Sequence, residues 1–219
     1  MQTLPKSIQT IIYELEKQNQ NLDNKALTQI IKKVEISKDE FLKYAKFDHC
    51  KTESYGRNII YQSQNFGIYV MSWSPGDFTG VHGHGHSEWG VVCFLGDADH
   101  RTYKANGKKI KLETSEIISE GTVAPVCGDL VHAMGNLSKQ PFITLHIYGS
   151  NSYSGTITED STLYEIEKNR IRKTFGPAFI NISDDLCKEN IHGIETDEKT
   201  KEDHSKIIQD FYKRNNIKM

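Results

Sequence analysis

Residues 57 to 149 form a series of short β-branched and aromatic runs separated by Gly, Pro, Asn and Asp. The runs are NIIYQ, GIYVMSW, GVVCFL, HRTYK and FITLHIYG. Their spacing is typical of the strands of an all-β sandwich or barrel. Asn106-Gly107 is a favourable hairpin turn between RTYKA and KKIKLE. The pattern predicts a mainly β fold for this part of the chain.

Helical patterns flank the predicted strands. Between residues 4 and 47, apolar residues recur three or four positions apart, which predicts two or three amphipathic helices. Ser37 and Glu40 have the form of a capping box at the start of a further helix. Residues 160–176 also have a helical pattern, which Gly176-Pro177 would end.

The length of 219 residues is compatible with one domain. We expect this domain to cover residues 1–182, including the N-terminal helices. Residues 183–219 are rich in charge and poor in apolar side chains, so we expect a charged C-terminal tail that is helical or partly disordered.

Composition excludes several classes of partner. The net charge of −2 gives no basic footprint for nucleic acid or for an anionic membrane. No apolar run approaches the roughly 20 residues that would span a bilayer, and the N-terminus does not resemble a signal peptide. The four cysteines show no CxxC spacing, which argues against a zinc ribbon or a disulfide framework. We therefore expect a cytoplasmic protein with reduced thiols, as a monomer or weak homo-oligomer.

Histidines are concentrated at alternate positions within one predicted strand, at 82, 84 and 86. Residues two apart on a strand share a face, so His82 and His84 can point together into a barrel. His86 can join them only if the glycines at 83 and 85 do not bend the strand. A third imidazole from a distant strand, His132, would complete a facial three-nitrogen site with open positions opposite. The alternative is a surface loop that binds metals adventitiously.

These residues resemble the two motifs of the cupin superfamily. The first motif here is His82-x-His84-x-x-x-Glu88 followed by Gly96, and the second contains Gly121, Pro125, Gly128, His132 and Asn136. The resemblance implies a cupin β-barrel, or jelly roll, with a metal ion held by His82, His84 and His132. Cupins carry out many reactions, so the fold alone does not give the function.

Segments outside the metal motifs resemble the cysteine dioxygenase family. They are Tyr44-Ala-Lys-Phe-Asp48, Tyr55-Gly-Arg57-Asn58, Trp73, and Thr144-Leu-His146-Ile-Tyr148, where threonine replaces the family's serine. The resemblance covers residues 40 to 150. It implies an iron(II) enzyme, Fe(2+) being its cofactor, that adds both atoms of dioxygen to the sulfur of cysteine and yields a sulfinic acid.

The resemblance also assigns roles to individual side chains. Arg57, Tyr55 and Trp73 would bind the substrate, and Tyr148, His146 and Thr144 would be catalytic. Alternation places Thr144, His146 and Tyr148 on one strand face, where they can form a hydrogen-bonded chain. A guanidinium such as that of Arg57 can hold a substrate carboxylate in a bidentate grip. The alternative is that these residues have no role in catalysis or binding. His146 and Tyr148 would then be ordinary core side chains, and Arg57 would be a surface charge.

Two departures from the family leave alternatives open. Several members carry a cysteine in the first motif that crosslinks to the tyrosine matching Tyr148; counting without gaps puts Trp89 there, so we predict no thioether. If Glu88 bound the metal, the sequence would instead predict a non-thiol oxygenase or an oxidase.

Features around Trp89 and His146 also resemble bacterial 3-mercaptopropionate dioxygenases, whereas Arg57 favours cysteine. The remaining alternative is a non-catalytic metal-binding cupin.

Overall fold

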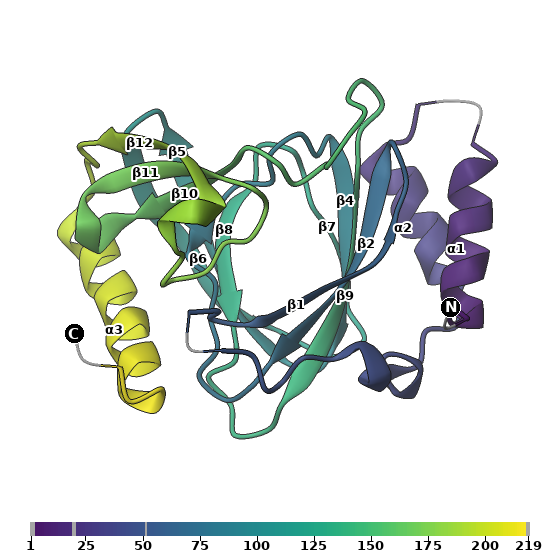
Figure 1. The fold of residues 1–219 in the computed structure, drawn as a ribbon, viewed down its shortest axis with the longest axis horizontal. Coiled ribbons are helices and arrows are strands. Elements are labelled where there is room, and N and C mark those ends of the chain that lie inside the picture. Colours follow the sequence, from purple (N-terminus) through teal and green to yellow (C-terminus); the bar gives the residue numbers. More distant parts are fainter. Residues whose placement is uncertain (1–2, 19–20, 51, 218–219) are drawn as a thin grey trace.

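The computed structural model describes residues 3–18, 21–50 and 52–217. Its strands form two antiparallel sheets that face each other, with helices outside (Figure 1). The five-stranded sheet runs β1-β2-β9-β4-β7, with strands Gly56–Gln62, Phe66–Trp73, Phe142–Gly149, Trp89–Leu95 and Val123–Pro125. The seven-stranded sheet runs β12-β11-β10-β3-β8-β5-β6, with strands Cys187–His192, Arg170–Thr174, Ser161–Glu165, Val81–His82, Val131–Gly135, Ala98–Asn106 and Lys109–Ile118.

This arrangement confirms the predicted mainly β cupin jelly roll. The strands of the described residues form two facing sheets and do not close into one continuously bonded barrel. The predicted Asn106-Gly107 turn joins β5 to β6, with Asn106 paired to Lys109. In this turn Gly107 has a φ of 59°, a conformation that glycine adopts without steric cost.

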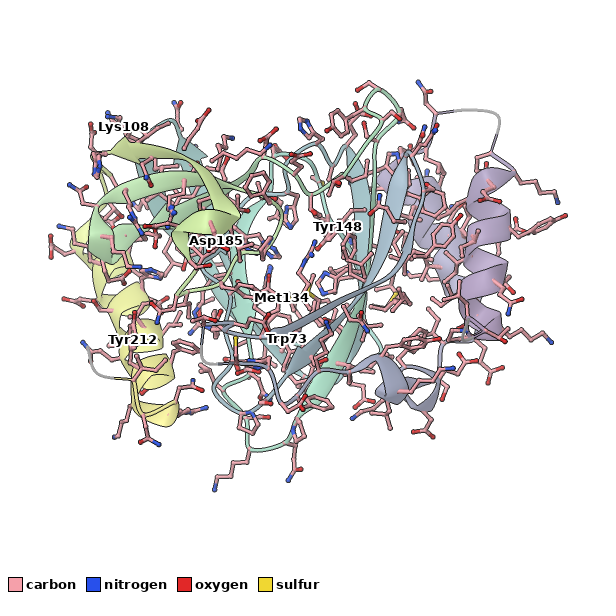
Figure 2. All side chains as sticks on the ribbon, viewed as in Figure 1. Trp73, Lys108, Met134, Tyr148, Asp185 and Tyr212 are labelled. Carbon is pink, nitrogen blue, oxygen red and sulfur yellow. The ribbon has the colours of Figure 1, made fainter. Side chains whose placement is uncertain are left out.

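Apolar side chains form three layers. The inner layer lies between the sheets, where Trp73 and Tyr148 of the five-stranded sheet meet Met134 of the other (Figure 2). A second layer lies between the five-stranded sheet and the N-terminal helices, and a third between the seven-stranded sheet and the C-terminal helix. Because the five-stranded sheet is covered on both faces, every residue of β2, β4 and β9 is buried.

The N-terminal helices predicted from periodicity are confirmed as α1, Lys6–Glu16, and α2, Asn24–Lys32. Asp23 caps α2 by accepting a hydrogen bond from the backbone N–H of Ala26 at 2.7 Å. The buried apolar side chains on these helices lie three or four residues apart: Ile8, Ile11 and Leu15 on α1, and Leu27 and Ile31 on α2.

The helix predicted after Ser37 is wrong in type and length. Only two single turns of 3-10 helix follow, η1 at Lys38–Glu40 and η2 at Leu42–Tyr44, and Ser37 makes no side-chain cap. The Glu40 carboxylate accepts a hydrogen bond from the Ser7 hydroxyl at 2.7 Å instead. Glu40, which was predicted to cap a helix beginning at Ser37, thus connects this segment to α1.

The helix predicted for residues 160–176 is also wrong. Strands β10 and β11 form a hairpin there, joined by the 3-10 turn η3 at Ile166–Lys168 and by Asn169 with φ 51°. Leu163 points to the inner layer and Tyr164 to the outer one, the alternation of a strand. Because Leu163 pairs with His82, the hairpin extends the sheet beside β3.

The last described segment contains the 3-10 turn η4 at Asp184–Leu186, strand β12, and helix α3 at Glu198–Arg214. The expected C-terminal helix is confirmed. Its buried face consists of Thr200, His204, Ile207 and Phe211, and it packs on the outer side of the seven-stranded sheet (Figure 1). A narrow stripe at helical spacing is enough to cover the sheet although few residues of the segment are apolar.

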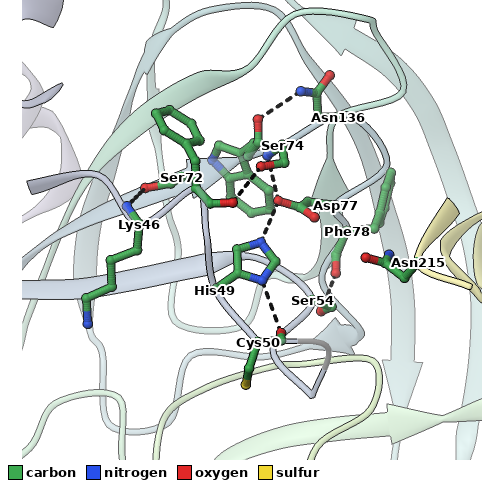
Figure 3. Close-up of polar contacts among 12 residues, drawn as sticks. Lys46, His49, Cys50, Ser54, Ser72, Ser74, Asp77, Phe78, Asn136 and Asn215 are labelled. Carbon is green, nitrogen blue, oxygen red and sulfur yellow. Dashed lines mark hydrogen bonds and ion pairs between the residues drawn. The ribbon is translucent and has the colours of Figure 1, made fainter. Parts of the chain in front are cut away.

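A buried polar network fixes the segment that leads into β1. Asp77 accepts hydrogen bonds from the His49 imidazole at 2.9 Å and from the backbone N–H of Ser74 at 2.6 Å (Figure 3). Asn136, from the second cupin motif, donates to the carbonyl of Trp73 at 2.9 Å. Residues far apart in sequence are thereby joined at the base of the inner layer.

All four cysteines are free thiols. Among the residues that the structure describes, no helix has both the length and the apolar character needed to cross a lipid bilayer.

Candidate metal centre

Three histidines meet between the sheets. His82 of β3 and His132 of β8 are direct cross-strand partners, and His84 follows in the loop after β3. The Nε2 atoms of His84 and His132 are 3.0 Å apart. One nitrogen from each of the three imidazoles lies within 4.8 Å of the others. The structure therefore brings together the three residues that the sequence singled out.

The local backbone differs from the predicted strand. Strand β3 ends at His82, and Gly85 adopts a φ of 61°. A Cβ at Gly85 would lie 2.1 Å from the carbonyl oxygen of Glu159, so only glycine is accommodated in this turn. The bend turns His84 toward His132 and leaves His86 outside the cluster.

The histidine cluster suits a divalent metal ion. Two imidazole nitrogens bound to one ion at about 2.1 Å and at right angles are about 3 Å apart, which matches the His84–His132 separation. Burial lowers the pKa of His82 to about 4 and holds the pKa values of His84 and His132 well below the usual range. The rings are therefore neutral near pH 7, the form that binds metals.

Contacts at the outer ring nitrogens orient the histidines. The Nδ1–H of His82 donates to the carbonyl of Gly80 at 3.0 Å, which leaves Nε2 for a metal. The Nδ1 of His132 lies 2.9 Å from Nε2 of His100. Two of the three imidazoles thus present Nε2 to the centre.

Glu88 and His86 are engaged elsewhere. Glu88 is exposed, and its carboxylate accepts hydrogen bonds from the backbone N–H of Asn151 at 2.6 Å and from the Ser152 hydroxyl. His86 stacks on Tyr153 and lies 3.0 Å from the Asp160 carboxylate. The structure therefore places neither of these two side chains in the histidine cluster.

A hydrogen-bonded relay runs along β9 and ends beside the cluster. The Trp73 indole N–H donates to the Thr144 hydroxyl at 2.9 Å, Thr144 Oγ1 is 2.7 Å from His146 Nε2, and His146 Nδ1 is 2.7 Å from the Tyr148 hydroxyl oxygen. Thr144 is fully buried, and in the described residues His146 Nε2 is the acceptor available to its hydroxyl hydrogen. Thr144 therefore donates to Nε2, and the single N–H of neutral His146 donates to Tyr148.

This direction leaves the Tyr148 hydroxyl hydrogen free to donate. The Tyr148 ring packs against His84, with 5.3 Å between ring centroids. Burial raises the pKa of Tyr148 above its usual value, and the nearby phenols of Tyr55 and Tyr69 raise it further. Tyr148 is thus a protonated donor next to the histidine cluster at neutral pH.

Arg57 brings a positive charge to the same cluster. Its guanidinium donates to the Thr158 hydroxyl at 3.1 Å and lies over the Tyr69 ring at 4.7 Å. The Arg57 charge opposes the rise in the pKa of Tyr148. Burial first, then His82 and Arg57, lower the pKa of His146 to about 3. Thr158 is the one hydrogen-bond partner of the guanidinium among the residues that the structure describes, so the other N–H groups of the fork are left for an anion.

The other two predicted substrate-binding residues lie behind this layer. Tyr55 stacks on Trp73 at 5.1 Å, and its hydroxyl accepts a hydrogen bond from the backbone N–H of Ala178 at 3.0 Å. The Trp73 N–H is used by Thr144. In this arrangement both polar groups have protein partners, which suits residues that hold the relay in place.

Counting without gaps puts Trp89 at the position of the family's crosslinking cysteine, but the residue opposite Tyr148 in the structure is the next one along β4. Gly90 is the cross-strand partner of Tyr148, whereas Trp89 faces the layer beneath the N-terminal helices. A Cβ at position 90 would lie 2.7 Å from the Tyr148 ring. The absence of a thioether crosslink stays a prediction, and the lack of a side chain at Gly90 is consistent with it.

Three residues near the centre were missed from the sequence: Tyr69, His100 and Thr158. Tyr69 could have been found by alternation, because it shares a strand face with Trp73. His100 lies in a recognised strand but meets His132 only through the pairing of β5 with β8. Thr158 lies in the loop before β10, and no local pattern marks it.

Several solved structures resemble the chain. A conserved protein with a double-stranded beta-helix domain from Klebsiella pneumoniae is 19% identical, with a TM-score of 0.41 over 54% of this chain and 91% of that one. TT1209 from Thermus thermophilus is 19% identical, with a TM-score of 0.40 over 53% and 98%. An oxalate decarboxylase from Bacillus subtilis, described as containing Mn(II) centers, is 16% identical, with a TM-score of 0.42 over 57% and 31%.

The family comparison is more specific. The sequence model of cysteine dioxygenase type I matches residues 2–155, well over half of the chain. The match includes the three clustered histidines, Arg57 and the whole relay. The chain belongs to the cysteine dioxygenase type I family.

Proposed function

We propose that this protein is a non-haem iron(II) thiol dioxygenase that converts L-cysteine to cysteine sulfinic acid. The supporting observation is the convergence of three neutral imidazoles, the free hydroxyl of Tyr148 and the guanidinium of Arg57 between the two sheets. The reaction adds both atoms of dioxygen to the sulfur, which loses four electrons as dioxygen gains them. His82, His84 and His132 would hold the iron.

Iron(II) at this position would supply the coordination and redox chemistry that lets a thiolate react with dioxygen. The protein's own residues bind and orient the substrate. Arg57 offers a charge-assisted, bidentate contact to the carboxylate, and Thr158 and the Tyr69 ring hold the guanidinium in place. The Tyr148 hydroxyl donates its hydrogen to the polar group of the substrate that lies beside His84.

The second candidate substrate is 3-mercaptopropionate. Arg57 accounts for recognition of a carboxylate, which cysteine and 3-mercaptopropionate share, and it does not account for the amine of cysteine. The contacts around the site thus support a small thiol acid as the substrate class, and within that class we propose cysteine.

Oxygen consumption by the iron-loaded protein against cysteine, 3-mercaptopropionate and cysteamine tests the proposal. Arg57→Ala should lower kcat/KM for the two carboxylates by about ten- to hundredfold, from a contact of roughly 1.5–3 kcal/mol. Cysteamine has no carboxylate, so the substitution should change its slow turnover little. The exposed arginine of α3 serves as the control, and Arg214→Ala should leave all three rates unchanged.

Each result has a distinct meaning. Equal losses for all three thiols in Arg57→Ala would make Arg57 a structural residue. Faster turnover of 3-mercaptopropionate than of cysteine by the wild type would identify the second candidate. Absence of oxygen uptake with every thiol would overturn the dioxygenase assignment.

A further inference from the structure

His100 lies next to the candidate metal centre without belonging to it. Its Nε2 is 2.9 Å from Nδ1 of His132, and the two rings meet edge to face, at 68°. Both residues are over nine-tenths buried, with exposed fractions of 8% and 2%. His100 comes from β5 and His132 from β8, which pair along this edge. The pairing of these two strands therefore places the His100 and His132 rings in contact.

If His132 binds a metal ion, the position of the hydrogen on each of the two imidazoles can be assigned. A neutral imidazole carries one N–H, so an His132 that binds metal through Nε2 must carry its hydrogen on Nδ1. His100 Nε2 is the atom placed to accept that hydrogen. His100 must then carry its own hydrogen on Nδ1. In the other tautomer, with the hydrogen on Nε2, His100 would donate to His132 instead.

We propose that His100 is a positioning residue of the metal centre, which fixes the tautomer and ring orientation of His132 by accepting its Nδ1–H. The proposal rests on His82, His84 and His132 binding a metal ion, as the proposed function requires. It does not depend on which thiol is oxidised. The equivalent contact of His82 goes to the backbone carbonyl of Gly80, so His132 depends on a side chain where His82 does not.

A surface carboxylate faces the far side of His100. Glu116 Oε1 lies 3.7 Å from His100 Nδ1, and the Glu116 side chain is 57% exposed. The two residues are cross-strand partners on β5 and β6. The carboxylate favours the hydrogen on Nδ1 of His100, which is the tautomer that lets Nε2 accept from His132. The imidazole of His100 thus lies between a metal ligand and an acidic group at the surface.

Metal affinity provides the direct test. Metal-free wild type, His100→Leu and His100→Gln would be titrated with Co(II) and with Zn(II) against a competing chelator, and the Co(II) absorption bands recorded. Loss of a contact to the outer nitrogen of a ligating histidine typically weakens metal binding by about 10–100-fold. His100→Leu should show this loss, and His100→Gln should recover most of the affinity, because its amide oxygen can accept a hydrogen bond.

Two controls separate positioning from general effects. His192→Leu makes the same chemical change at an exposed histidine of β12 and should leave metal affinity unchanged. Glu116→Gln keeps the side-chain size and should weaken metal binding by less than His100→Leu does. Affinity of folded His100→Leu within twofold of the wild type would overturn the proposal.

A measurement on the wild type covers the case in which His100→Leu does not fold. Nitrogen-15 NMR of the Zn(II)-loaded protein should show His132 protonated at Nδ1 and His100 protonated at Nδ1 with a bare Nε2. Zinc bound to Nδ1 of His132, or a proton on Nε2 of His100, would refute the assignment. If metal binds as described but no thiol is oxidised, the proposed function fails and this inference stands.

Discussion

The indole N–H of Trp73 donates to the hydroxyl of Thr144 across the β2–β9 ladder at 2.9 Å. The relay that ends at Tyr148 therefore begins on a neighbouring strand, outside the Thr-x-His-x-Tyr segment itself. Because Trp73 can only donate, it occupies the Thr144 oxygen as acceptor and leaves the hydroxyl hydrogen for His146.

Replacing Thr144 tests this relay. Thr144→Val keeps the shape of the side chain but leaves the Trp73 N–H and His146 Nε2 without partners. Unpaired buried polar groups cost about 1–3 kcal/mol, so the free energy of unfolding should fall by an amount of that order. The kcat for the best thiol should fall by at least about tenfold, one factor of ten being about 1.4 kcal/mol of barrier. Thr144→Ser should retain both properties, and equal activity of the Val and Ser variants would exclude a role for the hydroxyl.

Thr158 should influence substrate binding through Arg57. Thr158→Val removes the acceptor for one Arg57 N–H and keeps the side-chain volume. A net contribution of about 0.5–1.5 kcal/mol predicts a roughly two- to tenfold increase in KM for cysteine and 3-mercaptopropionate. Steady-state kinetics with cysteamine should show no change. The exposed neighbour provides the matched variant, Thr156→Val, and a similar KM increase there would speak against a specific contact.

The two histidines at 132 and 86 should differ in their effect on metal content. His132→Ala removes a nitrogen from the cluster and should abolish stoichiometric iron binding, measured by metal analysis of the purified, folded protein. His86→Ala removes only the contacts to Tyr153 and Asp160, so iron content should remain at the wild-type value. Full iron occupancy in His132→Ala would contradict the three-histidine site.

Buried His146 should make the protein sensitive to acid. Burial first, then the charges of His82 and Arg57, lower its pKa to about 3, against an ordinary value of about 6.5. The folded state therefore favours the neutral ring, and the stability that it contributes is present above pH 6.5 and is lost as pH falls toward 3. In that window the unfolded chain binds one more proton, so the free energy of unfolding falls by about 1.4 kcal/mol per pH unit from this group.

Urea unfolding of the metal-free protein at pH 7, 6 and 5 measures this loss. His146→Gln has no titrating group at this position, so its stability should fall less steeply with decreasing pH than that of the wild type. The other buried histidines act in both proteins, and the difference between the two slopes isolates His146. Parallel curves would show that His146 titrates alike in the folded and unfolded chains.

The sequence predicted those parts of the site that depend on spacing along one strand. The resemblance to the cysteine dioxygenase family pointed to Thr144, His146 and Tyr148, and the two-residue repeat of the strand placed them on one face. The cupin motifs pointed to His82, His84 and His132. His100 and Thr158 could not be predicted as site residues, because strand pairing and loop packing bring them to the site and neither leaves a local sequence pattern. The pattern of residues 160–176 predicts a helix, whereas the structure forms a hairpin in which the adjacent residues Leu163 and Tyr164 face opposite layers.

Strand β3 has only two residues, and it is held between β8 on one side and β10 on the other. His82 is paired with His132 and with Leu163, residues that are synthesised 50 and 81 positions later. A nascent chain that ends before residue 161 lacks one border of the strand that carries the first histidine. The position of His82 in the folded protein therefore depends on the β10–β11 hairpin as well as on β8, although the hairpin supplies none of the three clustered histidines.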